Sequence, residues 1–291
     1  MSGATTTAQQ TVDSGARRPP FARLLRHWRM SRKLSQLELA MVSEISQRHL
    51  SFLELGRAKP SRDMVLRLGD ALELPLRGQN ALLGAAGFAP HFRESALDAH
   101  AMKPVLGALR LMLRHHEPNP AVVIDRCWNL LMVNDAMQRV FGLLGDAEAI
   151  WAAVCGDGPR NLFKVLFHPQ GTRSAVANWD VVAPVMLSRT RREAEAEQNQ
   201  DLLDLLDDVL AYPGIPEDWR HAPLLAEDHP PVIPLELAHG GQRISLFSVI
   251  STFGTPGDIT TDELRVESFF PADEGTANLL QFLAAQAGEA H

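Results

Sequence analysis

The stretch that decides the fold covers residues 34–57, LSQLELAMVSEISQRHLSFLELGR. Leu37, Leu39 and Ala40 place apolar side chains on one face of a first helix, and Leu50 resumes an apolar face on a second. A short polar break separates the two apolar runs. The pattern predicts two short helices that are joined by a tight turn and pack against each other.

Serine residues stand where both helices should begin. Ser35 precedes Gln36 and Ser46 precedes Gln47, so each hydroxyl can accept a hydrogen bond from a backbone N–H that the helix leaves unpaired. With its leucines turned inward, the second helix presents polar side chains outward at its N-terminal end. Their types pair with base edges in the major groove of DNA, and they are Gln47, Arg48 and Ser51. The segment is therefore predicted to be a helix-turn-helix with these residues as base contacts.

The segment resembles the lambda-repressor and Cro-like (XRE) regulators along its whole length, including Ser-Gln at 35–36 and the closing Glu-x-Gly-Arg at 54–57. One residue departs from the family pattern, because Glu44 occupies a turn position where the family usually has glycine. That position commonly needs a left-handed backbone, which costs a non-glycine residue about 1 kcal/mol. The resemblance also implies that Arg29 pairs with Glu54; a phosphate contact of Arg29 is the alternative.

Further helices are predicted on both sides of the motif, over residues 21–32, 61–72 and 76–86. They complete a five-helix DNA-binding domain over residues 19–90. Polar and basic side chains around the motif are expected to contact DNA phosphate, and they are Gln36, Arg57, Lys59 and Arg62. A merely solvated basic loop is the alternative for the residues that follow the second helix.

Charge is divided unevenly along the 291 residues, whose net charge is −7. Residues 1–95 carry 14 Lys and Arg against 8 Asp and Glu, whereas residues 96–291 carry 14 against 27. The basic part contains the helix-turn-helix, and the acidic part should be repelled by DNA. The composition, 45% hydrophobic, is typical of a globular protein with real cores, so DNA binding and a second function are expected in separate domains.

Cysteine usage and the N-terminus indicate the compartment. Cys127 and Cys155 form no CxxC motif and have no histidine at metal-ligand spacing, which favours a reducing compartment and predicts no metal site. Residues 1–18 lack the apolar core of a secretion signal, and no run approaches membrane-spanning length. We expect a disordered leader over residues 1–18 in a cytoplasmic protein without membrane contact.

After residue 90 the pattern changes twice. Residues 91–118 are predicted to be a connector with a helix from 104 to 116, whose apolar stripe could pack on either domain or on a second protomer. An α+β domain follows over residues 119–275, with a C-terminal helix over 276–291. Its predicted strands are 121–124, 128–133, 231–237, 243–253 and 263–270, and its predicted helices are 136–141, 161–168, 174–197 and 202–210. This order indicates a five-stranded antiparallel sheet with helices on one face, the PAS architecture.

Several separated stretches carry a closer resemblance: SQRHLSFLE at 46–54, AAGFAP at 85–90, DRCWN at 125–129, ANW at 177–179, TFGTP at 252–256 and ESFFPAD at 267–273. Together they resemble the MmyB-like regulators over roughly residues 20–275. The resemblance implies that the second domain is a PAS-type module that binds a hydrophobic, fatty-acid-like ligand. Large apolar side chains are the candidates to line its pocket, and they are Trp128, Phe163, Phe167, Trp179, Met186 and Phe247.

The sequence also bears on two other classes of function for the second domain. An enzyme is disfavoured, because the sequence has no HExxH, GxSxG, P-loop or dinucleotide fingerprint and no nucleophile–base set, so no catalytic residue and no cofactor beyond a bound apolar molecule is predicted. A ligand-free assembly module that dimerises the protein is the main alternative to a sensor. A large cavity would favour sensing, and a tightly filled core would favour assembly. Either way, one helix-turn-helix reads few base pairs, so we expect a homodimer on an operator with two half-sites.

Overall fold

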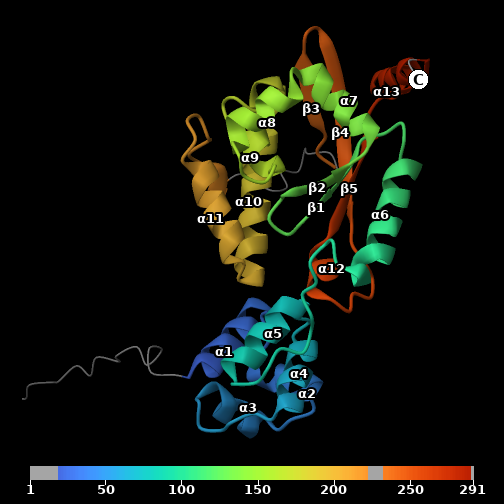
Figure 1. Ribbon diagram of the computed structural model, residues 1–291. Coiled ribbons are helices and arrows are strands. Elements are labelled where there is room, and N and C mark those ends of the chain that lie inside the picture. Colours follow the sequence, from blue (N-terminus) through green and yellow to red (C-terminus); the bar gives the residue numbers. More distant parts are fainter. Residues whose placement is uncertain (1–18, 222–231, 290–291) are drawn as a thin grey trace, which may run out of the picture. The chain divides into compact units, whose positions relative to one another are not determined.

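The computed structural model describes residues 19–221 and 232–289 (Figure 1). The leader expected over residues 1–18 lies outside the described residues. The chain divides into two compact units, residues 1–93 and 94–291. Most of the expected connector therefore clusters with the second unit.

The first unit is built from five helices, as expected. They are α1 (Pro20–Ser31), α2 (Gln36–Val42), α3 (Gln47–Glu54), α4 (Arg62–Ala71) and α5 (Leu76–Ala85). The Ser35 hydroxyl accepts a hydrogen bond from the backbone N–H of Glu38, whose carboxylate accepts one from the N–H of Ser35, so a capping box starts α2. The Ser46 hydroxyl accepts from the N–H of His49 at the start of α3. Both predicted N-caps are confirmed.

The core of the first unit is closely packed around Trp28, Leu39 and Leu50, which are almost fully buried. The prediction that Leu37 shares the buried face of α2 is wrong, because 52% of its surface is exposed. Two positions along a helix turn the side chain about 200°, so Leu37 and Leu39 point to opposite sides. Glu44 adopts the left-handed backbone expected for its turn position, with φ 55°.

The second unit contains a five-stranded sheet in which every pairing is antiparallel, in the order β2-β1-β5-β4-β3 (Figure 1). The strands are β1 (Ala121–Ile124), β2 (Leu130–Val133), β3 (Leu235–His239), β4 (Gln242–Ser251) and β5 (Arg265–Pro271). The expected fold class, an all-α domain followed by an α+β domain with a five-stranded antiparallel sheet, is confirmed.

One face of the sheet is covered by helices from the middle of the chain (Figure 1). They are α7 (Asp135–Leu144), α8 (Ala147–Cys155), α9 (Leu162–Phe167), α10 (Trp179–Glu197) and α11 (Gln200–Leu210). Of these, α8 was not predicted, and α10 begins later than residue 174, after a short 3₁₀ turn at Arg173–Ala175. Further 3₁₀ turns lie at His100–Met102 and Trp219–His221.

The opposite face of the sheet is covered by α6 (Lys103–His115), the helix expected to serve as a connector. Leu109 and Leu113 of α6 pack against Ala121 and Val123 of β1 and Val266 of β5. The prediction that helices cover only one face is therefore wrong. All four residues of β1 are buried, as expected for a strand that is covered on both sides.

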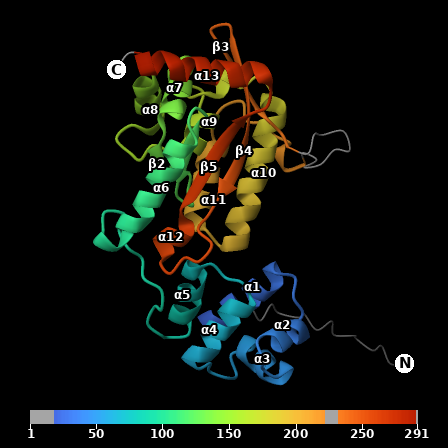
Figure 2. The ribbon, with the colours of Figure 1, turned by 90° about the vertical axis from the view of Figure 1, so that its right-hand side faces the viewer.

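The remaining helices lie at the ends of the second unit (Figure 2). α12 (Ile259–Glu263) is a short helix before β5 that the sequence pattern did not predict. α13 (Glu274–Glu289) is the expected C-terminal helix, and it packs against β4, β5 and α7.

Candidate DNA-binding face and ligand cavity

The predicted base contacts lie together at the N-terminal end of α3. Gln47 and Arg48 are exposed and Ser51 is half-buried. The guanidinium carbon of Arg48 lies 5.4 Å from the centre of the Phe52 ring, one turn further along α3. The structure thus brings all three predicted residues to one end of an exposed helix face, where they can enter a major groove.

The other side of α3 is fixed by an ion pair. The Nε and Nη2 atoms of Arg29 lie 2.6 and 3.1 Å from the two carboxylate oxygens of Glu54, which is only 2% exposed, and the Nη1 atom donates to the carbonyl of Leu34. This confirms the pairing that the family resemblance implied. The side-chain amide of Gln36 also donates to Glu54, at 2.8 Å, so a phosphate contact would have to use its second amide hydrogen.

Basic side chains follow α3. Arg57 and Lys59 are exposed in the loop that leads to α4. Arg62 begins α4 and is half-buried, with its Nη2 atom 2.9 Å from the Nδ1 atom of His91. The loop therefore offers Arg57 and Lys59 to solvent, whereas the side chain of Arg62 is already held within the unit.

The second unit encloses a cavity of about 380 Å³ between the sheet and helices α7, α9 and α10. Three of the six predicted lining residues are among its walls, namely Trp128, Phe163 and Met186. The other apolar lining residues are Met137, Val140, Phe141, Leu144, Leu162, Val165, Leu166, Val182, Val185, Val232, Ile233, Leu235, Leu237, Leu246 and Phe269. Polar side chains also reach the cavity, and they are Thr172, Arg189, Ser248 and Glu267.

The other three predicted lining residues do not line this cavity. Phe167 is fully buried in the core, with its ring 4.7 Å from that of Phe163 and 5.2 Å from that of Trp179. Phe247 lies between two lining residues of β4, and neighbouring side chains of a strand point to opposite faces. Its ring instead stacks on Phe270, 5.5 Å away.

Trp128 is held in place by the turn between β1 and β2. Its backbone is left-handed, with φ 66°, a conformation that favours glycine. The Asp125 carboxylate accepts hydrogen bonds from the N–H groups of Cys127 and Asn129, and the Asn161 amide donates to the carbonyl of Cys127. The indole N–H of Trp128 is buried and has no hydrogen-bond partner among the described residues. An unsatisfied buried donor costs about 1–3 kcal/mol, so an acceptor that a ligand brings to it would be favoured.

The polar group buried deepest at the cavity is Glu267, which is 7% exposed. Burial raises the pKa of this carboxyl, while a hydrogen bond from Ser248 and the charge of Arg189 act in the opposite direction. Within the part of the chain that the structure describes, Arg189 makes no ion pair. In the sequence, Arg189 continues the helical spacing of Val182 and Val185, and a charge at such a position is the signal that could have identified a polar end of the cavity.

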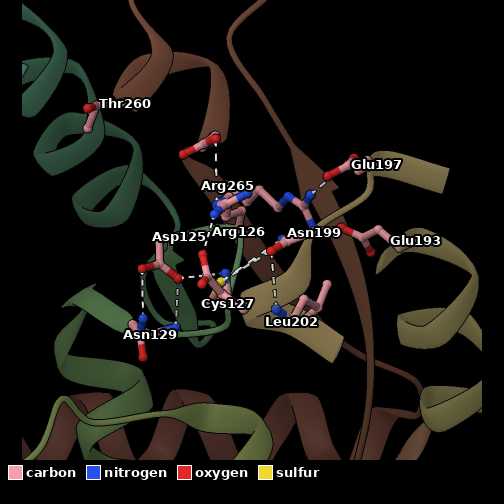
Figure 3. Close-up of polar contacts among 12 residues, drawn as sticks. Asp125, Arg126, Cys127, Asn129, Glu193, Glu197, Asn199, Leu202, Thr260 and Arg265 are labelled. Atoms are coloured by element: carbon pink, nitrogen blue, oxygen red, sulfur yellow. Dashed lines mark hydrogen bonds and ion pairs between the residues drawn. The ribbon is translucent and has the colours of Figure 1, made fainter. Parts of the chain in front are cut away.

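Beyond the cavity, ion pairs join α10 and α11 to the sheet (Figure 3). Arg265 of β5 pairs with Glu193 and, at 3.9 Å, with Glu197 of α10. Arg126, in the turn after β1, pairs with Asp201 at the start of α11. The nearby Cys127 thiol is half-buried, and burial raises its pKa to about 11. A thiol with this pKa is protonated at neutral pH and is a poor nucleophile, so the group has a structural role.

Residues 19–221 and 232–289 contain neither a candidate metal site nor a candidate membrane-spanning helix. No cluster of His, Cys, Asp or Glu there could hold a metal ion. No helix there combines the length and apolar character needed to cross a membrane.

Comparison with known proteins agrees with the two units. The sequence matches a family model described as "Helix-turn-helix domain" over residues 20–82 and one described as "MmyB-like transcription regulator ligand binding domain" over residues 105–283. No curated protein sequence matches the chain.

Among solved structures, the chain is similar to a PAS domain from Bordetella pertussis BvgS, with 18% identity over 64% of this chain and 99% of that one and a TM-score of 0.28. It is also similar to an RNA-binding light-oxygen-voltage receptor, with 14% identity over 95% of this chain and 65% of that one and a TM-score of 0.26. The family models, which together span both units, show what the chain is. It belongs to the family of MmyB-like transcription regulators, and its helix-turn-helix and PAS-like ligand-binding domains make it a DNA-binding regulator of transcription.

Proposed function

We propose that the cavity of the second unit binds a fatty-acid-like effector, and that this effector controls how a cytoplasmic homodimer binds an operator with two half-sites. The observation that carries the proposal is the cavity of about 380 Å³, with apolar walls and an arginine without an ion-pair partner among the described residues. Small-molecule sites are typically concave and apolar, with a few polar groups that fix the orientation of the ligand.

The lining chemistry supports an amphiphile with an acidic head group. The walls formed by Phe163, Met186 and their neighbours suit an alkyl chain, because burying apolar surface is the main source of affinity. Arg189 supplies a cation where the cavity reaches α10, and an arginine–carboxylate hydrogen bond is charge-assisted. A ligand that is apolar along its length and anionic at one end would satisfy both features.

The same cavity bears on the alternative, an assembly module without a ligand. Protein cores are packed with few voids larger than a water molecule, and an unfilled volume forfeits contacts on every wall. A module whose only task is dimerisation has no reason to keep an open space beside its sheet. The cavity therefore supports sensing over simple assembly.

The proposed sensing function is tested by identifying and then rebinding the ligand. Small molecules that co-purify with the full chain are released by denaturation and identified by mass spectrometry. Binding of dodecanoic acid to the ligand-free protein is then measured by calorimetry for the wild type and for the variants Arg189→Gln and Arg192→Gln.

Arg189→Gln should weaken binding at least tenfold, because loss of a charge-assisted hydrogen bond costs about 1.5–3 kcal/mol. Arg192→Gln is the matched control on the same helix, since Arg192 donates to the carbonyl of Ser188 and does not line the cavity. Equal affinities for all three proteins would remove Arg189 from the site. Failure of the wild type to bind would sink the fatty-acid proposal.

A further inference from the structure

Glu267 is an unusual residue for the wall of an apolar cavity. It lies in the middle of β5, beside Val122 of β1 and Ile250 of β4 in the sheet register. Its carboxyl is almost fully buried, and the hydroxyl of Ser248 on the adjacent strand, which also lines the cavity, acts to lower its pKa as a hydrogen-bond donor. A buried carboxylate is costly without a paired charge, so the residues around Glu267 decide which form it takes.

The charged groups near Glu267 can be counted from the elements packed against it. On β5 itself, Arg265 is already paired with Glu193 and Glu197 of α10. On α10, Arg189 is exposed and lines the same cavity, and its charge acts to lower the pKa of the Glu267 carboxyl. The cavity walls contributed by β3, β4, α7 and α9 bring no further charged side chain. Arg189 therefore serves the cavity as its only cation among the described lining residues.

A ligand carboxylate at Arg189 would share this one cation with Glu267. Two ionised carboxylates close to one arginine repel each other, and the burial of Glu267 makes that repulsion costly. The conflict disappears if Glu267 holds a proton, because its hydroxyl can then donate a hydrogen bond to the ligand carboxylate. Hydrogen bonds of this O–H···O⁻ kind are among the stronger ones.

We propose that Glu267 is a specificity-determining residue that couples binding of an acidic amphiphile to protonation: the ligand carboxylate binds Arg189 and accepts a hydrogen bond from protonated Glu267. Where Glu267 is ionised in the free protein, one proton moves from solvent to its carboxylate for each ligand bound. The inference rests on the proposed function. It adds that the protein selects a ligand with an anionic head group, because Arg189 supplies a positive charge and protonated Glu267 supplies a hydrogen-bond donor.

The sign of the pH dependence follows from this exchange. Dodecanoic acid is ionised above about pH 6 and Arg189 stays charged, so neither titrates in the useful range. Burial already raises the pKa of Glu267, and a bound carboxylate raises it further. Affinity should be constant below the pKa of Glu267 in the free protein and should fall by up to about tenfold for each pH unit above it.

The experiment measures the affinity of the full chain for dodecanoic acid and for dodecanol between about pH 6 and about pH 10, above the range in which dodecanoic acid itself titrates. The acid should lose affinity as the pH rises, while the uncharged alcohol should show a flat profile. Glu267→Gln, which imitates the protonated acid, should bind dodecanoic acid with a flat profile. Glu197→Gln is the matched control, because burial also raises the pKa of Glu197 but this residue faces Arg265 and does not line the cavity. It should keep the wild-type slope.

Proton uptake gives a second measurement that needs no variant. Calorimetric titrations of the wild type in buffers with different ionisation enthalpies should show uptake of up to one proton per dodecanoic acid and none per dodecanol. A pH-dependent affinity that persists in Glu267→Gln, or a flat profile together with zero proton uptake in the wild type, overturns this inference and leaves the proposed function intact. If neither amphiphile binds at any pH, the proposed function fails and this inference fails with it.

Discussion

The two units of this chain differ in what their interiors are built to do. In the helix-turn-helix unit, Trp28, Leu39 and Leu50 fill the core, and Glu54, its buried charged residue, is held by Arg29 and Gln36. The second unit has a larger core that leaves a cavity of about 380 Å³. The buried Glu267 lines this cavity together with Arg189, an exposed residue that has no ion pair among the described residues. The comparison shows two roles for a buried charged group. A group such as Glu54, whose ion-pair and hydrogen-bond partners are all present, stabilises the fold. A group such as Glu267, whose partners are incomplete, is available to bind a ligand.

The largest loss of stability is expected in the first unit, where the buried Glu54 has its full set of partners. Arg29→Ala should lower the free energy of unfolding of the first unit by about 3–5 kcal/mol, because it leaves Glu54 as a buried charge without its main partner. Amide hydrogen exchange of peptides from α1–α5 measures this loss separately from the second unit. Arg26→Ala, an exposed position on the same helix, is the control and should change little. A loss below about 1 kcal/mol in Arg29→Ala would mean that Gln36 alone suffices to hold Glu54.

The same contrast explains which features of each unit could be predicted from the sequence. In the first unit, the serine caps that start α2 and α3 were predicted correctly, because capping is a local signal. The Arg29–Glu54 pair and the left-handed Glu44 were also predicted correctly, but from the family resemblance. Leu37 was the exception, since an apolar type alone does not tell which side of a short helix faces the core.

Less of the second unit could be predicted, because its site depends on contacts between distant segments. The positions of the strands followed from their apolar, β-rich runs, and the antiparallel sheet followed from the order of strands and helices along the chain. The face of the sheet that each side chain occupies did not follow from either. Phe247 has the residue type expected of a cavity wall and points to the other face of β4. Glu267 and Ser248 are ordinary strand residues in the sequence, and only the register of β4 with β5 brings them together with Arg189 of α10.

The next effect tests whether the two units communicate at all. If the effector controls DNA binding, operator affinity should change by about 1–3 kcal/mol when dodecanoic acid saturates the protein, since this is the usual range of coupling between two sites. Reciprocity requires the operator to change the affinity for dodecanoic acid by the same factor. Fluorescence anisotropy with labelled operator measures the first ratio, and calorimetry in the presence of operator measures the second. If both ratios equal one, the bound molecule only fills the cavity of the second unit, and binding of the effector and binding of DNA are independent of each other.

The smallest effects are expected at the DNA-binding face, where Arg57 is predicted to contact phosphate and Arg48 to contact a base. Arg57 is exposed after α3 and is expected to contact phosphate, so Arg57→Ala should weaken specific and random DNA alike and lower the slope of log affinity against log salt concentration by about one unit. Arg48 lies at the exposed start of α3, and Arg48→Ala should instead cost about 1–3 kcal/mol on the operator and relax the preference at one base pair.

The two variants are a matched pair, because each removes one exposed arginine from the same unit. Affinities for operator and random DNA over a series of salt concentrations therefore distinguish loss of charge from loss of base reading. Equal losses on both DNAs for Arg48→Ala would reassign this residue to phosphate contact, and an unchanged salt slope for Arg57→Ala would remove it from the DNA-binding face. Because both arginines belong to the first unit and neither lines the cavity, neither variant should alter the affinity for dodecanoic acid measured without DNA.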